Sequence, residues 1–240
     1  MFKIFESHPG LVCSLSAKEG GQMKLRGDLI LDQTALANRR RFFDGLGIRE
    51  SQVTRANLIH GSKVLLVDSR NQGMMMVKTD GLVAGEKNLF LSLTVADCLP
   101  VFFFDPIKEA VGLVHAGWKG LDNGILAAAV EEFKSGFSSN LADILVGIGP
   151  GIEPCHFEVQ RDVLERFREF QAEALVGRED KTFLDLKKVA RLQLIKLGLK
   201  EENIETNPEC TFCLKDKYFS ARRDKLKKIE AMAAVIGLKA

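Results

Sequence analysis

Three apolar segments in the middle of the chain constrain its fold more than any other feature. Residues 89–95, 101–104 and 110–114 are predominantly apolar at both odd and even positions. Because successive side chains of a strand point to opposite faces, strands of this kind must be covered on both sides. The segments therefore predict buried strands at the centre of a layered structure.

Helical periods flank these strands. Apolar residues recur every three or four positions after about Asp122, and again over 163–174 and 186–197, where the last helix is expected to close at Gly198. A helix is also expected over about 33–43, and alternation over 23–31 suggests a strand. Short hairpin-like connections favour a mixed α/β sandwich over regular βαβ alternation. Since repeats and linkers are missing, we expect a single domain over residues 1–240.

Composition excludes several classes of protein. Hydrophobic residues make up 46% and charged residues 28%, as in a globular protein, and a net charge of +2 is too even to indicate a nucleic-acid partner. The longest apolar stretch is interrupted by Asp97 and Pro100, so no membrane span is expected. The N-terminus lacks a secretory signal, which indicates a cytoplasmic protein with its five cysteines reduced.

Three candidate ligands stand at the ends of apolar segments, namely His60, Cys98 and His115. If Asp105 paired with Lys108 across a four-residue turn, a simple hairpin would set Cys98 opposite His115, with Cβ atoms about 4.5–5.5 Å apart. A bulge would break that register.

One thiolate and two imidazoles suit Zn²⁺ and leave its fourth tetrahedral position open, which is typical of catalytic sites. Zinc at such a site lowers the pKa of a bound water toward about 7 or polarises a substrate oxygen. Taken singly, however, a cysteine between strands usually packs as a small apolar residue. A lone histidine near a strand end is usually only hydrogen-bonded.

The order of five motifs resembles the YfiH-like, laccase-domain family, whose members are described as purine nucleoside phosphorylases or polyphenol oxidases. The most specific are Ala96-Asp97-Cys98 and His115-Ala116-Gly117-Trp118. The resemblance spans roughly 38–224 and is carried by residues 59–61, 96–101, 115–120, 147–155 and 219–224.

This resemblance implies a single-domain α/β sandwich with zinc bound by His60, Cys98 and His115. It also implies phosphorolysis of adenosine, inosine, guanosine and methylthioadenosine, with adenosine deamination at the same site. The implied partners are thus a purine nucleoside and phosphate. The chain departs from the family at Lys119, where Arg is common, and lysine lacks the bidentate fork of arginine.

Phosphorolysis needs cations that neutralise the attacking phosphate. We consider Arg39, Lys119 and Arg222 as substrate-binding candidates, with Arg223 beside the last of them. Asp97, adjacent to Cys98, could orient a ligand, accept a proton or form a buried salt bridge. The basic run at 39–41 could equally be a solvated helix face.

Two other activities stay open. A copper polyphenol oxidase would need several coppers held largely by imidazoles, and the chain has four histidines. Alternatively, Cys98 could be a nucleophile activated by His115 in an amidase or peptidoglycan-editing hydrolase. The oligomeric state is not indicated.

The lone CxxC of Cys210 and Cys213 is weak evidence for a metal site by itself. With Cys155 and His156 it could supply a second, structural zinc site.

Overall fold

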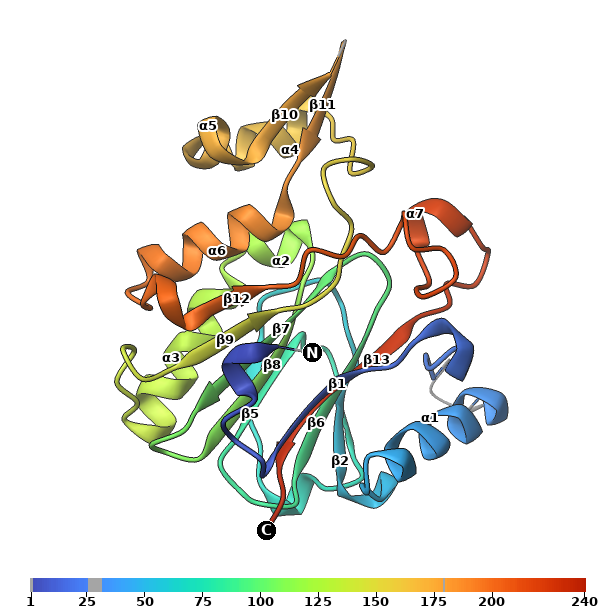
Figure 1. Ribbon diagram of the computed structural model, residues 1–240, viewed down its shortest axis with the longest axis vertical. Coiled ribbons are helices and arrows are strands. Elements are labelled where there is room, and N and C mark those ends of the chain that lie inside the picture. The colour runs from blue at the N-terminus through green and yellow to red at the C-terminus, as the bar shows by residue number, and fades with distance from the viewer. Residues whose placement is uncertain (1, 26–31, 179) are drawn as a thin grey trace.

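The computed structural model describes residues 2–25, 32–178 and 180–240, and these form two large sheets and a hairpin. The first sheet contains, in spatial order, β1 (Leu11–Leu15), β13 (Met232–Leu238), β6 (Phe90–Val95), β2 (Val53–Ala56) and β4 (Met75–Met76). The second contains β12 (Ile204–Thr206), β9 (Leu145–Ile148), β7 (Leu99–Asp105), β8 (Ala110–Ala116), β5 (Gly81–Ala84) and β3 (Val64–Leu66). The separate hairpin joins β10 (Leu175–Arg178) to β11 (Lys181–Leu184) and projects from one end of the molecule (Figure 1).

The α-helices of the described residues are α1 (Gln33–Gly45), α2 (Trp118–Asp122), α3 (Ile125–Phe137), α4 (Arg161–Arg166), α5 (Gln171–Ala174), α6 (Leu186–Lys196) and α7 (Ala221–Asp224). Both sheets mix parallel and antiparallel pairs; β2 runs parallel to β6, for instance, whereas β13 runs antiparallel to it. None of the helices in the described ranges is both long and apolar enough to cross a bilayer.

The elements stack in layers, with the two sheets face to face and helices outside them (Figure 1). Phe102 and Phe104 of β7 join Leu91 and Ile236 in the core between the sheets. Phe103, which points the other way, packs in a second core with side chains of α3 and α6. Helix α1 covers the outer face of the first sheet through Phe43 and its neighbours.

The mixed α/β sandwich expected from the sequence is therefore confirmed. All residues of β7 and β8 are buried, as strands that are apolar on both faces require. The helix expected near Asp122 starts earlier, as α2, and breaks at Gly124, whose φ of 78° is left-handed, before continuing as α3. The helix expected over 163–174 is also interrupted, by a 3₁₀ turn at Arg168–Phe170.

Helix α6 ends as expected near Gly198, which has a φ of 101°. Most of the strand expected over 23–31 lies outside the described residues.

The expected register of the β7–β8 hairpin is wrong by two residues. Asp105 pairs with Ala110, and Pro100 instead of Cys98 pairs with His115. The turn is longer because Asp105 Oδ1 accepts hydrogen bonds from the N–H groups of Ile107 (2.8 Å) and Lys108 (3.0 Å). The paired register begins with Leu99 opposite Ala116, so Cys98 lies in the bend just before β7.

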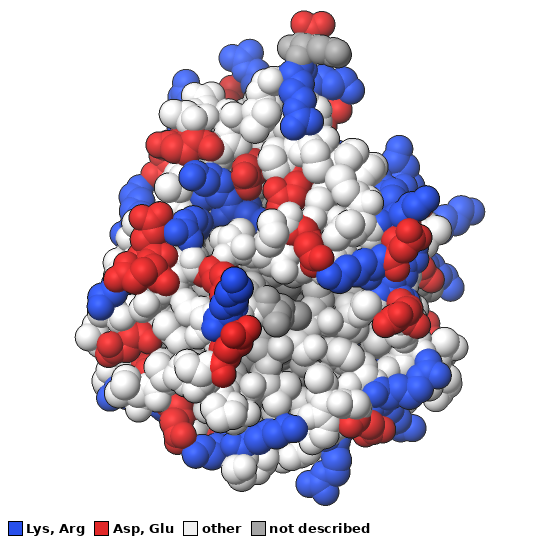
Figure 2. All heavy atoms as spheres, in the orientation of Figure 1, with Lys and Arg blue, Asp and Glu red and all other residues white. Residues whose placement is uncertain are grey.

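Basic and acidic side chains are interspersed over the face in Figure 2, in keeping with the small net charge.

Candidate metal and substrate site

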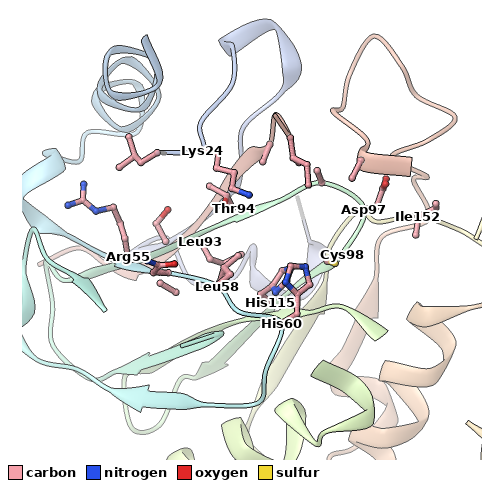
Figure 3. Close-up of a pocket in the computed structure, with 18 of the residues that line it drawn as sticks. Lys24, Arg55, Leu58, His60, Leu93, Thr94, Asp97, Cys98, His115 and Ile152 are labelled. Atoms are coloured by element: carbon pink, nitrogen blue, oxygen red, sulfur yellow. The ribbon is translucent and has the colours of Figure 1, made fainter. Parts of the chain in front are cut away.

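His60, Cys98 and His115 converge from three separate loops and strands (Figure 3). His60 lies between β2 and β3, Cys98 lies between β6 and β7, and His115 is near the end of β8. One ligand atom from each lies within 4.8 Å of the others, and the two imidazole rings meet edge to face at 4.8 Å between centroids. The arrangement brings together the three residues that the sequence singled out.

Asp80, directly before β5, organises both histidines. Its buried carboxylate accepts hydrogen bonds from the backbone N–H groups of His60 (2.9 Å) and Gly61 (2.8 Å), which hold His60 at a left-handed φ of 60°. Asp80 Oδ1 also lies 3.0 Å from His115 Nδ1. If Nδ1 carries the proton in that bond, Nε2 of His115 is left as a ligand atom, the arrangement usual for metal-binding histidines.

The same contacts keep Asp80 ionised. Burial by itself would raise its pKa, but the hydrogen bonds from His115 and from the Gly61 and Ile59 N–H groups outweigh it and lower the pKa. A carboxylate at this position favours a site that binds a cation.

Cys98 and His115 form a thiolate–imidazolium pair when no metal separates them. Burial opposes both charges, but the positive charge of His115 and hydrogen bonds from both histidines lower the pKa of Cys98 to about 6. Burial likewise disfavours the charged form of His115, yet Cys98 and Asp80 raise the pKa of His115 to about 9. The sulfur is thus deprotonated near neutral pH, as a metal ligand or a nucleophile must be.

Gly117 leaves room for this sulfur. A Cβ atom built at Gly117 would lie 2.7 Å from Cys98 Sγ and 3.7 Å from the His60 ring. The glycine at the N-cap of α2 is therefore required by close packing, since its φ of −79° is open to other residues.

The three residues line a cavity of about 920 Å³, within the range of sites for small molecules. In the view of Figure 3 they lie between Arg55 and Lys24 on one side and Asp97 and Ile152 on the other. Cationic and apolar side chains share the lining, including Lys24, Arg39, Arg55, Arg222, Lys225, Leu58, Leu93, Ile152, Phe157 and Ile229.

Arg39, which is buried, and Arg55, which is half-buried, form a cationic wall and share one carboxylate. Arg55 donates to Glu50 Oε1 at 2.8 Å, and Arg39 reaches the same oxygen at 3.4 Å. Burial lowers the pKa of Arg39 to about 10 although Glu50 raises it, so the guanidinium stays charged at neutral pH. The buried Arg55 Nε has no hydrogen-bond partner among the described residues. The two cations share one carboxylate, which leaves positive charge on this wall to balance an anion.

Asp97 is turned toward α7. Held at a φ of 84°, its carboxylate accepts hydrogen bonds from Thr211 Oγ1 (2.7 Å), Ser220 Oγ (3.0 Å) and the Arg222 N–H (2.7 Å). These contacts fasten the start of α7 to the loop that carries Cys98.

The cationic candidates separate into two groups. Arg39 and Arg222 line the cavity, and the Arg222 guanidinium donates to the Glu158 carbonyl at 3.2 Å. Lys119 is exposed, its ammonium lies 5.4 Å from the centre of the Trp118 ring, and it is not among the lining residues.

Asp80 and Arg55 were not among the site residues predicted from the sequence. An acid immediately before the apolar stretch 81–84 was a usable signal for Asp80. Arg55 carries no such signal, because its place beside Arg39 depends on the packing of α1 against β2.

The donor set fits one borderline-soft ion. Two imidazoles and a thiolate, backed by a carboxylate, suit tetrahedral zinc with one open position, and they are also ligands of copper.

The chain is similar to known proteins over most of its length. A family model described as "Multi-copper polyphenol oxidoreductase laccase" matches residues 31–239. The purine nucleoside phosphorylase YlmD of Bacillus subtilis is 33% identical over 87% of this chain and 78% of its own length. The purine nucleoside phosphorylase YfiH of Escherichia coli is 33% identical over 78% of this chain and 75% of its own.

Two solved structures share the fold. The crystal structure of YlmD from Geobacillus stearothermophilus has a TM-score of 0.91 at 29% identity, covering 100% of this chain and 94% of that chain. The hypothetical protein YfiH of Bacillus licheniformis has a TM-score of 0.88 at 31% identity, with coverage of 95% and 93%.

Proposed function

This chain belongs to the family described as multi-copper polyphenol oxidoreductase laccase, and from that premise we propose that it is a zinc-dependent purine nucleoside phosphorylase that also deaminates adenosine. Its substrates would be adenosine, inosine, guanosine and methylthioadenosine, and one domain over residues 1–240 would carry the activity. The names of relatives at 33% identity support the reaction class. The observation that carries the proposal is the cluster of His60, Cys98 and His115 in a cavity with a cationic wall.

In this proposal His60, Cys98 and His115 hold zinc, which supplies Lewis-acid chemistry at its open position. Asp80 orients both imidazoles, because it accepts hydrogen bonds from His115 Nδ1 and from the N–H of His60. Asp97 is a positioning residue, since its carboxylate is already used by Thr211, Ser220 and Arg222.

Phosphorolysis forms a bond between a phosphate oxygen and the ribose C1′ and breaks the bond from C1′ to the purine nitrogen, which leaves with a proton. Arg39 and Arg55 are suited to bind the phosphate, because two guanidinium groups of the cavity lining share the single carboxylate of Glu50. Apolar residues of the lining, among them Leu58, Ile152 and Phe157, would pack against the base.

Deamination needs the same cavity but no phosphate. Water adds to C6 of adenine and ammonia leaves, so the reaction depends on the histidine and cysteine ligands and not on the arginine wall. Measuring the two reactions side by side therefore distinguishes the role of the histidine and cysteine ligands from the role of the arginine wall.

A second candidate, a cysteine hydrolase acting on amides or peptidoglycan, is favoured by one observation. The lowered pKa of Cys98 beside a protonated His115 is typical of an activated thiol nucleophile. A copper oxidase has weaker support, since the described residues offer a single His-Cys-His group and a separate cysteine-rich group instead of a multi-imidazole cluster.

The test is to incubate zinc-loaded protein with inosine or adenosine, with and without phosphate, and to identify the products. The proposal expects ribose 1-phosphate and free purine only when phosphate is present, and inosine from adenosine without it. Cys98→Ala should abolish both, whereas Cys13→Ala, which removes a thiol on β1, should abolish neither. A Cys98-dependent amidase with no nucleoside turnover would favour the second candidate.

A further inference from the structure

A second group of metal-type ligands lies outside the cavity described above. Cys155 and His156 follow β9 in one turn, and Cys210 and Cys213 occupy a turn after β12. One ligand atom from each of the four lies within 4.8 Å of the others. None of the four lines the cavity, so the proposed nucleoside chemistry does not explain them.

The distances fit a single tetrahedral ion. Cys155 Sγ lies 3.6 Å from Cys210 Sγ and 3.5 Å from Cys213 Sγ, and His156 Nδ1 lies 3.1 Å and 3.4 Å from the sulfurs of Cys155 and Cys213. Sulfurs placed 2.3 Å from a tetrahedral zinc ion would be about 3.8 Å apart. Four ligand atoms thus already stand close to the corners of one coordination shell.

The two turns are held in place independently of any ion. A bridge pairs Gly151 with Cys210, and the Thr211 N–H donates to the Gly151 carbonyl at 3.0 Å. The Glu153 N–H points at Cys210 Sγ at 3.4 Å, as backbone donors do toward metal-bound thiolates. The ring of His156 is stacked on Phe212 at 3.8 Å between centroids, which fixes its orientation.

We propose that Cys155, His156, Cys210 and Cys213 bind one zinc ion in a closed, structural site. Three thiolates and one imidazole match the ligand set of structural zinc and leave no position for a substrate. The site joins the turn after β9 to the turn that carries Thr211. Since Thr211 donates a hydrogen bond to Asp97, the proposed zinc site also fastens the wall of the cavity beside Cys98.

Metal content measured on four proteins tests this site separately from the cavity. The wild type, Cys213→Ala, Cys98→Ala and Cys13→Ala are purified under reducing conditions from zinc-supplemented medium without chelator. Zinc per chain is then measured by elemental analysis. Cys213→Ala removes an exposed ligand, and Cys13→Ala is the matched control because Cys13 belongs to neither group.

We expect Cys98→Ala to retain about one zinc ion per chain and Cys213→Ala to contain about one fewer than the wild type. Cys13→Ala should match the wild type. The proposal is overturned if Cys98→Ala contains no zinc, or if Cys213→Ala contains as much as the wild type. A Cys155–Cys213 disulfide in freshly purified protein, seen by mass spectrometry, would also overturn it.

Cobalt provides a second measurement on protein whose cysteine turns are intact. Co²⁺ added to metal-free Cys98→Ala protein should give the intense thiolate-to-metal absorption of a tetrahedral site with several sulfurs, and Zn²⁺ should abolish it. Absence of this absorption would contradict the proposal even if Cys213→Ala failed to fold. If nucleoside turnover were never found, these metal counts would still show whether the second zinc site exists.

Discussion

At the scale of single residues, the buried carboxylate of Asp80 determines where the histidines stand. It is the shared acceptor for three consecutive backbone N–H groups, at Ile59, His60 and Gly61, and for the His115 ring. The left-handed backbone of His60 is strained for a residue other than glycine, and these hydrogen bonds offset that strain. Loss of the carboxylate should therefore displace two ligands at once.

Replacing Asp80 with Asn should weaken zinc binding at the His60–Cys98–His115 site by about 10- to 100-fold, the usual effect of removing a group that orients a metal ligand. Competition with a chromophoric chelator measures the affinity. The matched control is Asp105→Asn, a buried aspartate at the turn of the β7–β8 hairpin, at the opposite end of that hairpin from His115. Equal zinc affinity in wild type and Asp80→Asn would show that Asp80 does not act through the metal ligands.

The charge pair of Cys98 and His115 gives a pH dependence in metal-free protein. The pKa of Cys98 falls from 9.0 to about 6 on folding, so its stabilisation is present above pH 9 and is lost as pH falls through about 6. The pKa of His115 rises from 6.5 to about 9, so its stabilisation is present below pH 6.5 and is lost as pH rises through about 9. The pair should exist between about pH 6 and 9.

Thiolate absorbance in the ultraviolet, taken as the difference between metal-free wild type and Cys98→Ala, should therefore rise with a midpoint near pH 6. His115→Phe should move the midpoint upward, because it removes the largest favourable charge. A wild-type midpoint near 9, the ordinary value for a thiol, would be inconsistent with this pairing.

Arg55 should contribute to the binding of phosphate and not to the binding of adenosine. Arg55→Gln removes a half-buried cation from the cavity wall and should raise the KM for phosphate by at least about tenfold, the effect of losing about 1.4 kcal/mol of binding. Deamination of adenosine, which uses no phosphate, should keep its KM. Lys119→Gln is the comparison variant, and its KM for phosphate is measured by the same steady-state kinetics. If Lys119→Gln raised this KM and Arg55→Gln did not, the result would contradict our assignment of the anion site.

At the scale of elements, the start of α2 is packed directly against the metal ligands. Because a Cβ atom at Gly117 would lie 2.7 Å from Cys98 Sγ, Gly117→Ala should force the thiol aside. Overpacking of this kind costs about 1–3 kcal/mol of stability, and the displaced sulfur should bind zinc about tenfold more weakly. Gly45→Ala, at the end of α1, has open space around the added methyl and should bind zinc like the wild type. Thermal unfolding and zinc titration of both variants check the prediction, which equal zinc affinities would contradict.

The elements also show what the sequence could and could not predict. Strands β6, β7 and β8 were predictable because apolar side chains on both faces leave few alternatives, and with them the position of Cys98 and His115 at strand ends. The hairpin register was not, because it depends on hydrogen bonds from the turn to the Asp105 side chain. The roles of Asp80 and Arg55 depend on contacts between segments far apart in the chain, for which a single sequence carries little signal.

At the scale of the whole molecule, the sandwich brings chemistry from both sheets to one cavity. Arg55 and Ser92 come from the first sheet, whereas His115 comes from the second, and α7 closes the side beside Asp97. The cationic wall and the ligand cluster are thus fixed relative to each other by the cores that hold the layers together. On this account the anion and the metal are bound at separate parts of one rigid site.

The most direct test of the central claim is whether nucleoside turnover follows zinc at the His60–Cys98–His115 site. Metal is removed with a chelator, zinc is returned in steps, and phosphorolysis of inosine is measured at each step alongside bound zinc. We expect turnover to fall to background without zinc and to return in proportion to the zinc bound at this site, which is the wild-type zinc count less the zinc that Cys98→Ala retains. Full turnover in protein shown to be metal-free would contradict the account.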